Sequence, residues 1–434
     1  MLSSLKKCIG HRSPLRLGWH QLKAFLAALR FGFPAKKLAV IGITGTDGKT
    51  TTVAMTAHIL HLCAVPVGAV STSFLRIKGS VRENPTHKTS LSPFALQKFL
   101  RECLDAGCTT VIVECSSHGL VQHRLDFLWP KVAAITNTSP EHLDYHGTME
   151  QYRADKAILF EMLGGKGIKV LNADDGTYEM YRKISSAKTV TFACDKGHGT
   201  RDNTIHFWAM DIAATSAKTT ADIHHSLSPV PCHISLPIPG DFNLENALCA
   251  VACATCIGVP VHQSAEALKT FTGVAGRLEK IDEGQNFSVY VDFTVTPRSY
   301  EVTLDAIRET LPPEKHLLVL TGSCGDRMRE KRPQIGKICS ERADTVVVTE
   351  DETLTEDPMK VIDEVFAGID QSKTSAHKIP DRREAIRFLF KEAKPGDAVI
   401  LCGMGSCTTM QTREGLKPWD ERKVARELLQ SLKI

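Results

Sequence analysis

Short apolar runs alternate with longer amphipathic stretches over much of the chain. The apolar runs lie at 38–43, 67–71, 110–114 and 132–136, and helical spacing of apolar residues is found at 50–62, 92–106 and 149–163. Runs of five or six apolar residues are typical of buried β-strands. Their alternation with helices predicts an α/β fold, in which helices cover both faces of a parallel sheet.

The same pattern starts again after a glycine-containing hinge at 273–277. Its predicted strands are 289–292, 317–321, 345–349 and 398–402, each followed by a helical stretch. A chain of 434 residues is long enough for two or three domains. We expect three parts, namely an N-terminal segment (1–37), a central domain (38–275) that includes a small β insertion near 196–235, and a C-terminal α/β domain (276–434).

The N-terminal segment is basic and amphipathic. Residues 1–37 contain eight Lys or Arg and no Asp or Glu. Apolar residues at helical spacing are Leu17, Trp19, Leu22, Phe25, Leu26 and Leu29. The pattern predicts a helix that ends before Gly32 and packs its apolar face on the neighbouring domain. Peripheral contact with an anionic membrane surface is the alternative, and a mitochondrial presequence has a similar composition.

Composition narrows the class of protein. The chain is 42% hydrophobic and 24% charged, with a net charge of +4, which gives no case for nucleic acid as the main partner. No apolar run approaches the roughly 18 residues of a spanning helix. Most of the 14 cysteines lie in apolar periodic runs, and the one C-x-x-C pair, Cys253 and Cys256, has no second pair at zinc-ribbon spacing. We therefore expect reduced core cysteines in a cytoplasmic, soluble monomer.

A candidate phosphate-binding loop follows the first predicted strand. Gly45 and Gly48 lie in the strand-to-helix turn, where backbone N–H groups and the helix N-terminus favour phosphate. Lys49 can reach the outer phosphates, and the Thr50 hydroxyl suits Mg²⁺. The spacing departs from the general P-loop pattern, because Ile43 stands where the first glycine is usual.

Two further motifs follow predicted strands. Glu114 ends a strand, so a parallel sheet brings it near the loop, where a carboxylate suits Mg²⁺. His142 and His146 have the spacing of a zinc helix. However, Leu143 replaces the general-base Glu and Gly147 breaks the helix, so zinc hydrolysis is not expected.

Several blocks together carry a resemblance to one family. They are the loop 40–52, Glu114-Cys-Ser-Ser-His-Gly-Leu-Val-Gln-His-Arg124, His142-Leu-Asp-Tyr-His-Gly-Thr-Met149, Gly276-Arg277-Leu278-Glu279, Gly325-Asp326-Arg327, Lys331-Arg332-Pro333 and Glu356-Asp357-Pro358. These blocks occur in the same order in the Mur ligases, which the chain resembles, most closely in the MurE branch. The resemblance implies a central P-loop ATPase domain followed by a Rossmann-like C-terminal domain.

The resemblance also implies a chemistry. ATP phosphorylates the carboxylate of a UDP-N-acetylmuramoyl-dipeptide acceptor, and the amino group of an incoming amino acid displaces phosphate from the acyl phosphate. Lys49 and Mg²⁺ neutralise the charge of the two anions that meet. The resemblance further implies that Thr50 and Glu114 hold one Mg²⁺, that His142 supports a second, and that Lys156 binds metal if it is carbamylated.

The other implied contacts are divided between ATP and the substrates. Those for ATP are Thr46, Gly48, Lys49, Thr50, Thr51, Asn246, Arg277 and Asp292. Those for the acceptor and the amino acid are Thr89, Ser90, Ser116, Gln122, Arg124, Arg327 and Asp351, with Arg327 gripping the amino-acid carboxylate as a bidentate guanidinium can.

The sequence also departs from the family. Only 37 residues precede the ATPase pattern, where the family carries a uridine-nucleotide domain. The family's Asp-Asn-Pro-Arg becomes Asp351-Glu352-Thr353-Leu354, and its Gly-Lys-Gly-His-Glu becomes Gly403-Met404-Gly405-Ser406-Cys407. Loss of that Arg and that Glu disfavours diaminopimelate, and Val295 cannot donate to a phosphate.

Two hypotheses from different classes remain. The first is an ATP-dependent ligase of peptidoglycan precursor synthesis. Folylpolyglutamate synthetase and cyanophycin synthetase share the fold, but the motifs after Glu114 and His142 favour the MurE branch. The second is a degenerate ATP-binding scaffold that acts with a partner protein, for which Val295, Met404 and Cys407 and the basic N-terminal helix would be the relevant features.

Overall fold

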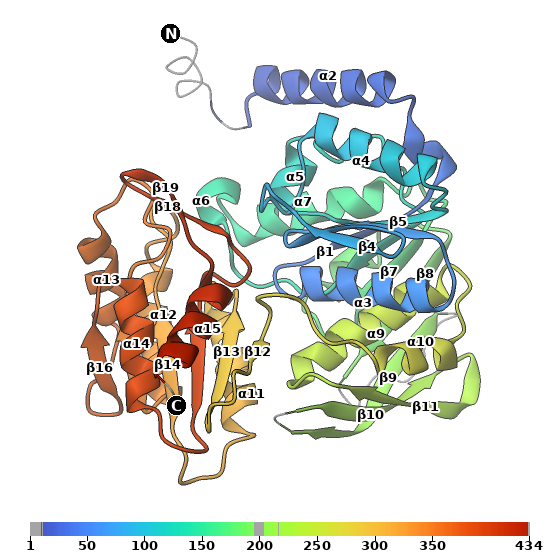
Figure 1. The fold of residues 1–434 in the computed structure, drawn as a ribbon. Coiled ribbons are helices and arrows are strands. Elements are labelled where there is room, and N and C mark those ends of the chain that lie inside the picture. The colour runs from blue at the N-terminus through green and yellow to red at the C-terminus, as the bar shows by residue number, and fades with distance from the viewer. Residues whose placement is uncertain (1–9, 11, 195–203, 216, 433–434) are drawn as a thin grey trace. The chain divides into compact units, whose positions relative to one another are not determined.

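The computed structural model describes residues 10, 12–194, 204–215 and 217–432. The chain divides into two compact units, shown in Figure 1. The first unit contains residues 1–213, 220–236 and 242–271, and the second contains 214–219, 237–241 and 272–434. The predicted α/β class is confirmed for both units. The domain limits expected at 37 and 275 stay predictions, as do the parts of the N-terminal segment and of the β insertion that lie outside the described residues.

A single large sheet forms the centre of the first unit. In sheet order its strands are β11 (Ser228–Leu236), β10 (Thr219–His225), β9 (Ile205–Ala214), β8 (Lys188–Ala193), β7 (Ile168–Asn172), β6 (Val132–Ile135), β1 (Ala39–Thr44), β5 (Thr110–Glu114), β2 (Val67–Val70), β3 (Phe74–Ile77) and β4 (Ser80–Glu83). The pairs from β2 through β5, β1, β6, β7 and β8 to β9 are parallel, while β3 and β4 add an antiparallel edge. The residues of β2, β5 and β6 are buried throughout, which explains why these strands are continuously apolar.

Helices cover this sheet. They are α2 (Pro14–Arg30), the 3₁₀ helix η1 (Pro34–Lys37), α3 (Lys49–Leu62), α4 (Pro93–Asp105), α5 (Ser117–Val121), α6 (Leu143–His146), α7 (Met149–Glu161), α8 (Tyr178–Tyr181), α9 (Asp241–Thr255) and α10 (Val261–Leu268). Side-chain caps set several starts, because Ser92 accepts from the Ala95 N–H at the start of α4 and Thr148 accepts from the Gln151 N–H at the start of α7. The predicted helices 50–62, 92–106 and 149–163 are confirmed as α3, α4 and α7.

The predicted β insertion is a continuation of the large sheet. β9 pairs in parallel with β8, with Val190 opposite Ile205, and β10 and β11 follow it at the edge. The sequence pattern had indicated β structure but not its partner. Pairing between strands is decided by contacts distant in sequence, which local periodicity does not carry.

The second unit has its own sheet. In sheet order its strands are β12 (Glu279–Ile281), β13 (Ser288–Asp292), β17 (Ala398–Cys402), β14 (Leu317–Thr321), β15 (Thr345–Val348) and β16 (Ser375–Lys378), beside a hairpin of β18 (Thr409–Thr412) and β19 (Gly415–Pro418). Within this sheet all pairs are parallel except β12 with β13, and the hairpin of β18 and β19 is antiparallel. Its helices are α11 (Pro297–Arg308), α12 (Lys331–Arg342), α13 (Pro358–Phe366), α14 (Arg382–Glu392) and α15 (Glu421–Leu432). The four strands predicted here are confirmed as β13, β14, β15 and β17.

The N-terminal helix is where it was predicted, but the packing expected for it is wrong. α2 packs against α4 through Ala24, Ala27 and Ala28, which are at most 1% exposed. The large apolar residues point away, with Trp19 at 54% and Leu29 at 56% exposure. Small alanines allow two helices to approach closely, so they rather than the leucines form the packed face. Of the helices that the structure describes, none has the length and apolar character needed to cross a membrane.

Candidate active site

The glycine-rich loop lies at the carboxyl edge of the central strands of the first unit. Ile43 of β1 pairs with Glu114 of β5, and Thr44 pairs with Ile135 of β6, so the segments that follow these strands begin at one edge. Ligands of parallel α/β sheets bind at this edge. The predicted proximity of Glu114 to the loop is thereby confirmed.

The loop needs glycine at both positions for steric reasons. Gly45 has φ +147°, and a Cβ there would lie 1.9 Å from Thr136 Oγ1. Gly48, at the start of α3, has φ +79°, and a Cβ there would lie 2.1 Å from Asn246 Oδ1. Since both conformations are rare for other residues, the backbone N–H groups of this turn can be presented only by glycine. Asn246 is thus placed beside the loop, on α9, with 4% of its surface exposed.

The segment after β6 braces the loop. Asn137 accepts hydrogen bonds from the Thr46 N–H through its carbonyl (2.9 Å) and from the Asp47 N–H through its side chain (3.0 Å). Thr136 donates to the Asp47 carbonyl at 2.6 Å, and the Ser139 N–H donates to the Thr46 hydroxyl at 3.0 Å. These bonds fix the loop before any ligand is present, which lowers the entropic cost of binding one.

A hydroxyl and a carboxylate meet at the start of α3. Thr50 Oγ1 lies 3.1 Å from both carboxylate oxygens of Glu114 and donates to them. Glu114 also accepts from the Thr72 N–H at 2.8 Å and from the Thr72 hydroxyl at 3.1 Å. The sequence motifs did not indicate Thr72. It follows β2 as Glu114 ends β5, so the rule applied to Glu114 would have identified it.

Two lysine side chains donate hydrogen bonds to carbonyl groups of the loop. Lys49 Nζ donates to the Thr46 carbonyl at 2.6 Å, and Lys156 Nζ donates to the Gly45 carbonyl at 2.7 Å. Lys156 is 1% exposed, and its Nζ lies 4.3 Å from the ring centroid of Tyr152. Burial, followed by the nearby positive charge of Lys49, holds the pKa of Lys156 well below its ordinary value. The helix lysine is therefore not the solvated side chain that its sequence position alone would favour.

The histidines after β6 have different surroundings. His142 precedes α6 with φ +57°, and its ring meets that of His118 edge to face at a centroid distance of 4.7 Å. His146 is buried, shares a 3.0 Å hydrogen bond with Ser117 Oγ, and contacts the Asp155 carboxylate, which also pairs with Arg12. Its ring packs on that of His118 as well, at a centroid distance of 5.1 Å, so both histidines border His118.

The predicted acceptor residues form one connected cluster. The Ser90 and Ser116 hydroxyls are 3.0 Å apart, and Arg124 donates to the Ser90 carbonyl at 3.2 Å. Arg124 also donates to Gln122 at 2.5 Å, and Gln122 donates to the Tyr145 hydroxyl at 3.1 Å. A further bond of 3.0 Å, from the Thr72 to the Thr89 hydroxyl, joins the cluster to Glu114.

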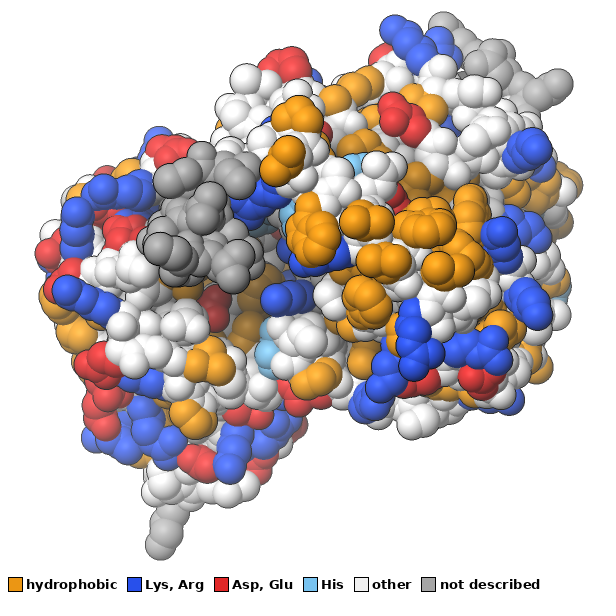
Figure 2. Space-filling view, turned by 90° about the horizontal axis from the view of Figure 1, so that it is seen from above, with side chains coloured by type: hydrophobic (Ala, Val, Ile, Leu, Met, Phe, Trp, Pro, Cys, Tyr) orange, Lys and Arg blue, Asp and Glu red, His pale blue; other side chains and the backbone are white. Residues whose placement is uncertain are grey.

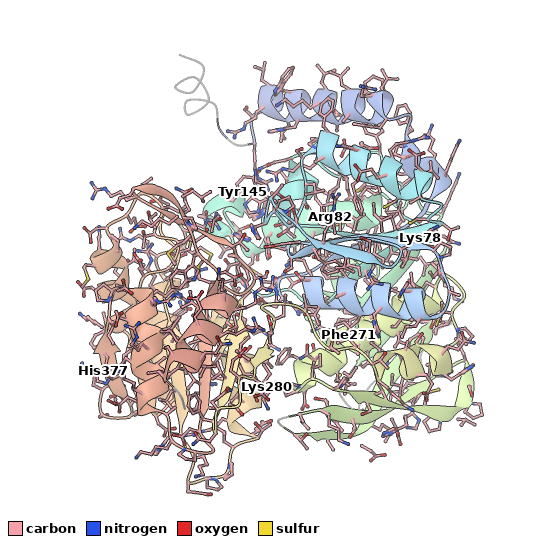
Figure 3. All side chains as sticks on the ribbon, in the orientation of Figure 1. Lys78, Arg82, Tyr145, Phe271, Lys280 and His377 are labelled. Atoms are coloured by element: carbon pink, nitrogen blue, oxygen red, sulfur yellow. The ribbon has the colours of Figure 1, made fainter. Side chains whose placement is uncertain are left out.

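Tyr145, labelled in Figure 3, shows how the cluster is held on its other side. Its ring packs on that of His118 at a centroid distance of 4.2 Å. Burial lowers the pKa of Arg124, but an arginine remains charged throughout the ordinary pH range. The cluster thus offers hydroxyls, an amide and one cation, a set suited to a carboxylate-bearing ligand.

The second unit carries the remaining predicted ATP contacts. The Arg277 guanidinium carbon lies 4.4 Å from the ring centroid of Phe293, and Arg277 donates to the Phe293 carbonyl at 3.5 Å. The Asp292 carboxylate accepts from the Leu278 N–H at 2.6 Å and from the Thr294 hydroxyl. The two residues are therefore neighbours within this unit, joined by the β12–β13 pairing.

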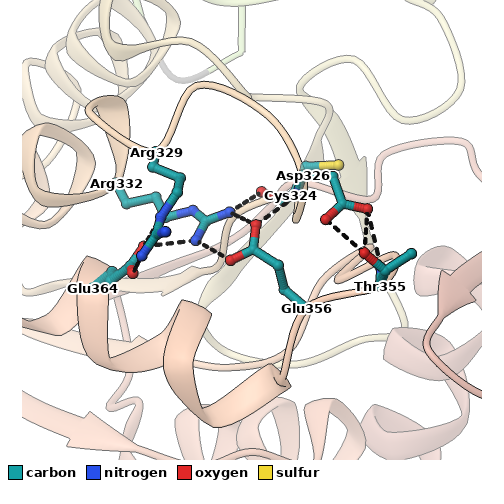
Figure 4. A network of polar contacts seen from close by, with 7 residues as sticks. All are labelled: Cys324, Asp326, Arg329, Arg332, Thr355, Glu356 and Glu364. Carbon is teal, nitrogen blue, oxygen red and sulfur yellow. Dashed lines mark hydrogen bonds and ion pairs between the residues drawn. The ribbon is translucent and has the colours of Figure 1, made fainter. Parts of the chain in front are cut away.

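A charged network holds the loop that contains Arg327 (Figure 4). Arg332 donates to both oxygens of Glu356, at 2.7 and 3.0 Å, and to Glu364 at 2.6 Å. Asp326 accepts from the Thr355 hydroxyl at 2.8 Å, and its N–H donates to Glu356 at 2.6 Å. The hydrogen bond from Arg332 is the main reason that the pKa of Glu356 falls to about 2. Motifs that lie 30 residues apart in sequence are thereby joined at one place.

Carboxylates surround the position expected for the amino acid. Asp351 is 7% exposed, and a Cβ on Gly403 would lie 2.2 Å from its Oδ2. Burial, followed by the charge of Asp351, raises the pKa of Glu352. Burial and then the charges of Glu352 and Asp351 raise the pKa of Cys407 to about 12. Met404 is 1% exposed and belongs to the core, so it does not offer a polar group.

The residues at the first unit's loop fit a magnesium-bound nucleotide. Both glycines take backbone conformations that other residues rarely adopt, and Thr50 and Glu114 supply oxygen ligands. Within the described part of the chain, no three His, Cys, Asp or Glu side chains come together as a metal site. Mg²⁺ is commonly held by one or two carboxylates with substrate phosphates, so a complete protein cage is not needed.

Fold and site together define an α/β ATPase joined to a second α/β unit. The family model of the Mur ligase middle domain matches residues 43–254, and that of the Mur ligase glutamate ligase domain matches residues 276–405. The chain belongs to the Mur ligase family. It is thus an ATP-dependent enzyme of the class that forms amide bonds, and the resemblance seen in its motifs is confirmed.

Individual relatives agree with this assignment. The UDP-N-acetylmuramyl-tripeptide synthetase of Roseiflexus sp. is 35% identical over 428 residues, covering 94% of this chain and 81% of that protein. The UDP-N-acetylmuramoyl-L-alanyl-D-glutamate--2,6-diaminopimelate ligase of Trichormus variabilis is 37% identical over 388 residues, covering 88% and 75%.

Solved structures agree as well. A structure of UDP-N-acetylmuramoyl-L-alanyl-D-glutamate--2,6-diaminopimelate ligase is 28% identical, covers 92% of this chain and 79% of its own, and has a TM-score of 0.63. MurF ligase from Thermotoga maritima in complex with ADP is 18% identical, covers 94% and 83%, and has a TM-score of 0.67. At that identity the likeness to MurF concerns the fold alone.

Proposed function

We propose that this chain joins an amino acid to a UDP-N-acetylmuramoyl-dipeptide type of acceptor in peptidoglycan precursor synthesis, with conversion of ATP to ADP and phosphate. The observation that carries the proposal is the contact of the Thr50 hydroxyl with both oxygens of Glu114, at 3.1 Å, at the first turn of a helix that opens with the glycine-rich loop. A carboxylate that only stabilised the fold would not need to lie beside a hydroxyl at the phosphate-binding loop. Mg²⁺ bound to Thr50 and Glu114 would supply charge neutralisation for phosphoryl transfer.

The chain's own residues would then perform two tasks. The loop N–H groups and Lys49 hold the nucleotide phosphates, so that the acceptor carboxylate oxygen can attack the γ-phosphorus while ADP leaves. The cluster of Ser90, Ser116 and Arg124 orients that carboxylate. The amine nitrogen of the amino acid then attacks the acyl carbon, the carbon–oxygen bond to phosphate breaks, and the amine loses a proton.

Lys156 fits the proposed carbamate. Burial lowers the pKa of Lys156 and so favours the neutral amine, the form that attacks CO₂ to make a nitrogen–carbon bond with release of one proton. The product is an anion in place of a cation. Incubation with ¹³C-labelled bicarbonate would yield a carbamate carbon signal that Lys156→Met lacks, and an identical signal in both proteins would refute the modification.

The amino acid proposed is one without a second carboxylate. Leu354 follows Asp351 and Glu352 in the chain and stands where diaminopimelate-adding relatives carry an arginine, so this position offers no second cation beside Arg327, whose charge acts on Glu352. A second substrate carboxylate would be repelled there. Lysine is therefore the first amino acid to compare with diaminopimelate.

The test is phosphate release by the purified chain with ATP, Mg²⁺, UDP-N-acetylmuramoyl-dipeptide and each amino acid in turn. Release that needs the acceptor and one amino acid is expected, and Lys49→Ala should abolish it. Lys166→Ala, at an exposed lysine outside the loop, is the matched control and should leave the rate unchanged. ATP binding with no release in any combination would favour the second hypothesis, a scaffold that acts with a partner, for which the replaced Val295 and Cys407 positions are the motivation.

A further inference from the structure

The outward face of α2 is apolar and exposed among the residues that the structure describes. The exposed fractions of its side chains are 78% for Leu15, 54% for Trp19 and 56% for Leu29. Leu22 is 46% and Leu26 is 43% exposed. Scattered exposed apolar residues are ordinary, but four leucines and a tryptophan on one helix face form a contiguous patch of the kind that marks an interaction site.

Helix geometry shows that this face is opposite to the packed one. Successive residues of a helix are about 100° apart, which places Leu15, Leu22 and Leu26 on the side away from the buried Ala24 and Ala28. α2 is therefore firmly docked by its alanines and free to present its leucines. A surface helix of a soluble domain normally has the reverse arrangement.

Cations run along one border of the apolar face. Arg16, Lys23 and Arg30 are spaced by seven residues, so they follow each other along one side of α2. The Lys23 ammonium lies 5.1 Å from the ring centroid of Trp19. Residues 1–37 contain no Asp or Glu, so no acidic side chain of this segment offsets the row.

The patch continues past the end of α2 into an aromatic group. Phe25 of α2 packs on Phe33 and Phe127, at centroid distances of 6.3 and 6.0 Å, and Phe127 packs on Trp129 at 5.8 Å. Trp129 is 43% exposed, and the Lys36 ammonium lies 5.1 Å from its ring. Figure 2, which looks down on the side that carries α2, shows hydrophobic side chains gathered beside Lys and Arg.

We propose that this face, from Leu15 to Leu29 with Trp129 and the flanking cations, docks the protein on a bilayer surface rich in anionic lipid. Leucines and aromatic rings would enter the boundary between headgroups and acyl chains, while Arg16, Lys23 and Arg30 meet lipid phosphates. Tryptophans at both ends of the patch suit that boundary, because the ring is apolar and its N–H is a donor. The positive charge beside this face is complementary to anionic lipid headgroups. A protein groove could bind the same face only if its walls were acidic, so we choose the lipid.

The experiment is co-sedimentation of the full chain with vesicles of phosphatidylcholine alone or of equimolar phosphatidylcholine and phosphatidylglycerol. We expect binding to the anionic vesicles, at least about tenfold weaker binding to the neutral ones, and release by high salt. Wild-type protein that stays in the supernatant with anionic vesicles, or that binds both vesicles equally, would overturn the proposal.

Variants locate the contact. Leu22→Asp with Leu26→Asp should reduce binding by at least about tenfold, as should Lys23→Glu with Arg30→Glu. Leu227→Asp, at another exposed leucine, and Lys166→Glu are the matched controls and should bind as wild type does. All these positions are exposed except Lys23, which is half-buried, and circular dichroism and melting temperature check that each variant is folded. If a variant does not fold, the salt and lipid dependence of wild-type binding still tests the proposal.

Two other occupants would give distinct results. A second copy of the chain would give a concentration-dependent dimer in sedimentation velocity that Leu22→Asp with Leu26→Asp abolishes, without vesicle binding. A soluble protein partner would leave both vesicle types unbound. Either result would overturn the lipid proposal.

Discussion

Thr50 on α3 and Glu114 at the end of β5 are 64 residues apart in sequence, yet the threonine hydroxyl lies 3.1 Å from both oxygens of the carboxylate. The register of β1 with β5 produces this contact, because Ile43 stands opposite Glu114 and the loop then turns directly into α3. A hydroxyl and a carboxylate so placed can share one divalent cation.

The first prediction concerns that carboxylate. Glu114→Gln keeps the shape of the side chain but removes the charge that offsets a divalent cation, so ligation-dependent phosphate release should fall by about 10²–10³. The measurement is the initial rate over a range of Mg²⁺ concentrations. Glu102→Gln alters an exposed glutamate of α4 and should change the rate less than twofold. Equal rates for Glu114→Gln and wild type would contradict the proposal that Glu114 binds the metal.

The second prediction concerns the loop glycine before Thr46. Gly45→Ala would combine a positive φ of +147° with a Cβ 1.9 Å from Thr136 Oγ1, so both the loop and its brace must move. We expect weaker ATP binding by at least about tenfold, measured by calorimetry. Gly164→Ala also has a positive φ, +56°, but no atom within 4 Å of its Cβ, so it isolates the backbone strain. It should lower the melting temperature slightly and leave ATP affinity unchanged.

The third prediction compares two neighbouring arginines of α14. Arg382 and Glu421 form an ion pair at 2.7 Å, and both side chains are 0% exposed. Arg382→Ala leaves the Glu421 charge buried and unpaired, which should cost about 3–5 kcal/mol of unfolding free energy. Arg383 pairs with Glu427 at 2.9 Å, but the two side chains are 40% and 42% exposed. Arg383→Ala should therefore cost no more than about 1 kcal/mol in urea denaturation, and equal losses would contradict the argument.

The fourth prediction concerns pH. The pKa of Glu356 is lowered from 4.5 to about 2 by the hydrogen bond from Arg332, so the folded state favours the ionised carboxylate. Its contribution to stability is complete above the unfolded pKa and is lost as pH falls through the folded pKa. Wild type should thus melt at a higher temperature than Glu356→Gln above pH 4.5, and the gap should narrow as pH approaches 2. A gap that widens on acidification would contradict the prediction.

Several features of the fold could be predicted because they depend on residues that are close together in the sequence. Continuous apolar runs predicted β1, β2, β5 and β6, since strands buried on both faces tolerate few polar residues. The two glycines and Gly-Lys-Thr predicted the loop, because only glycine adopts its conformations. The order of motifs indicated the family, and those at Glu114 and His142 lie at the end of a strand and in the segment that follows one.

Other features have no local signal. Strands β3, β4, β12 and β16 are four residues or shorter, and β4 is exposed throughout, so periodicity does not distinguish them from loops. The position of Thr72 after a strand end was a usable signal, but its contact with Glu114 depends on the pairing of β2 with β5. The Arg332 network likewise joins segments whose separation in sequence hides their contact.

The sequence by itself determined that α2 would form and that it would be basic and amphipathic. Spacing of apolar residues and composition are properties of the chain alone. Tertiary structure alone decided which face is buried. Ala24, Ala27 and Ala28 approach α4 closely, and the leucines, too large for that contact, are left outward. Hydrophobicity marks the residues that can be removed from water, whereas the shape of the neighbouring surface decides which of them are.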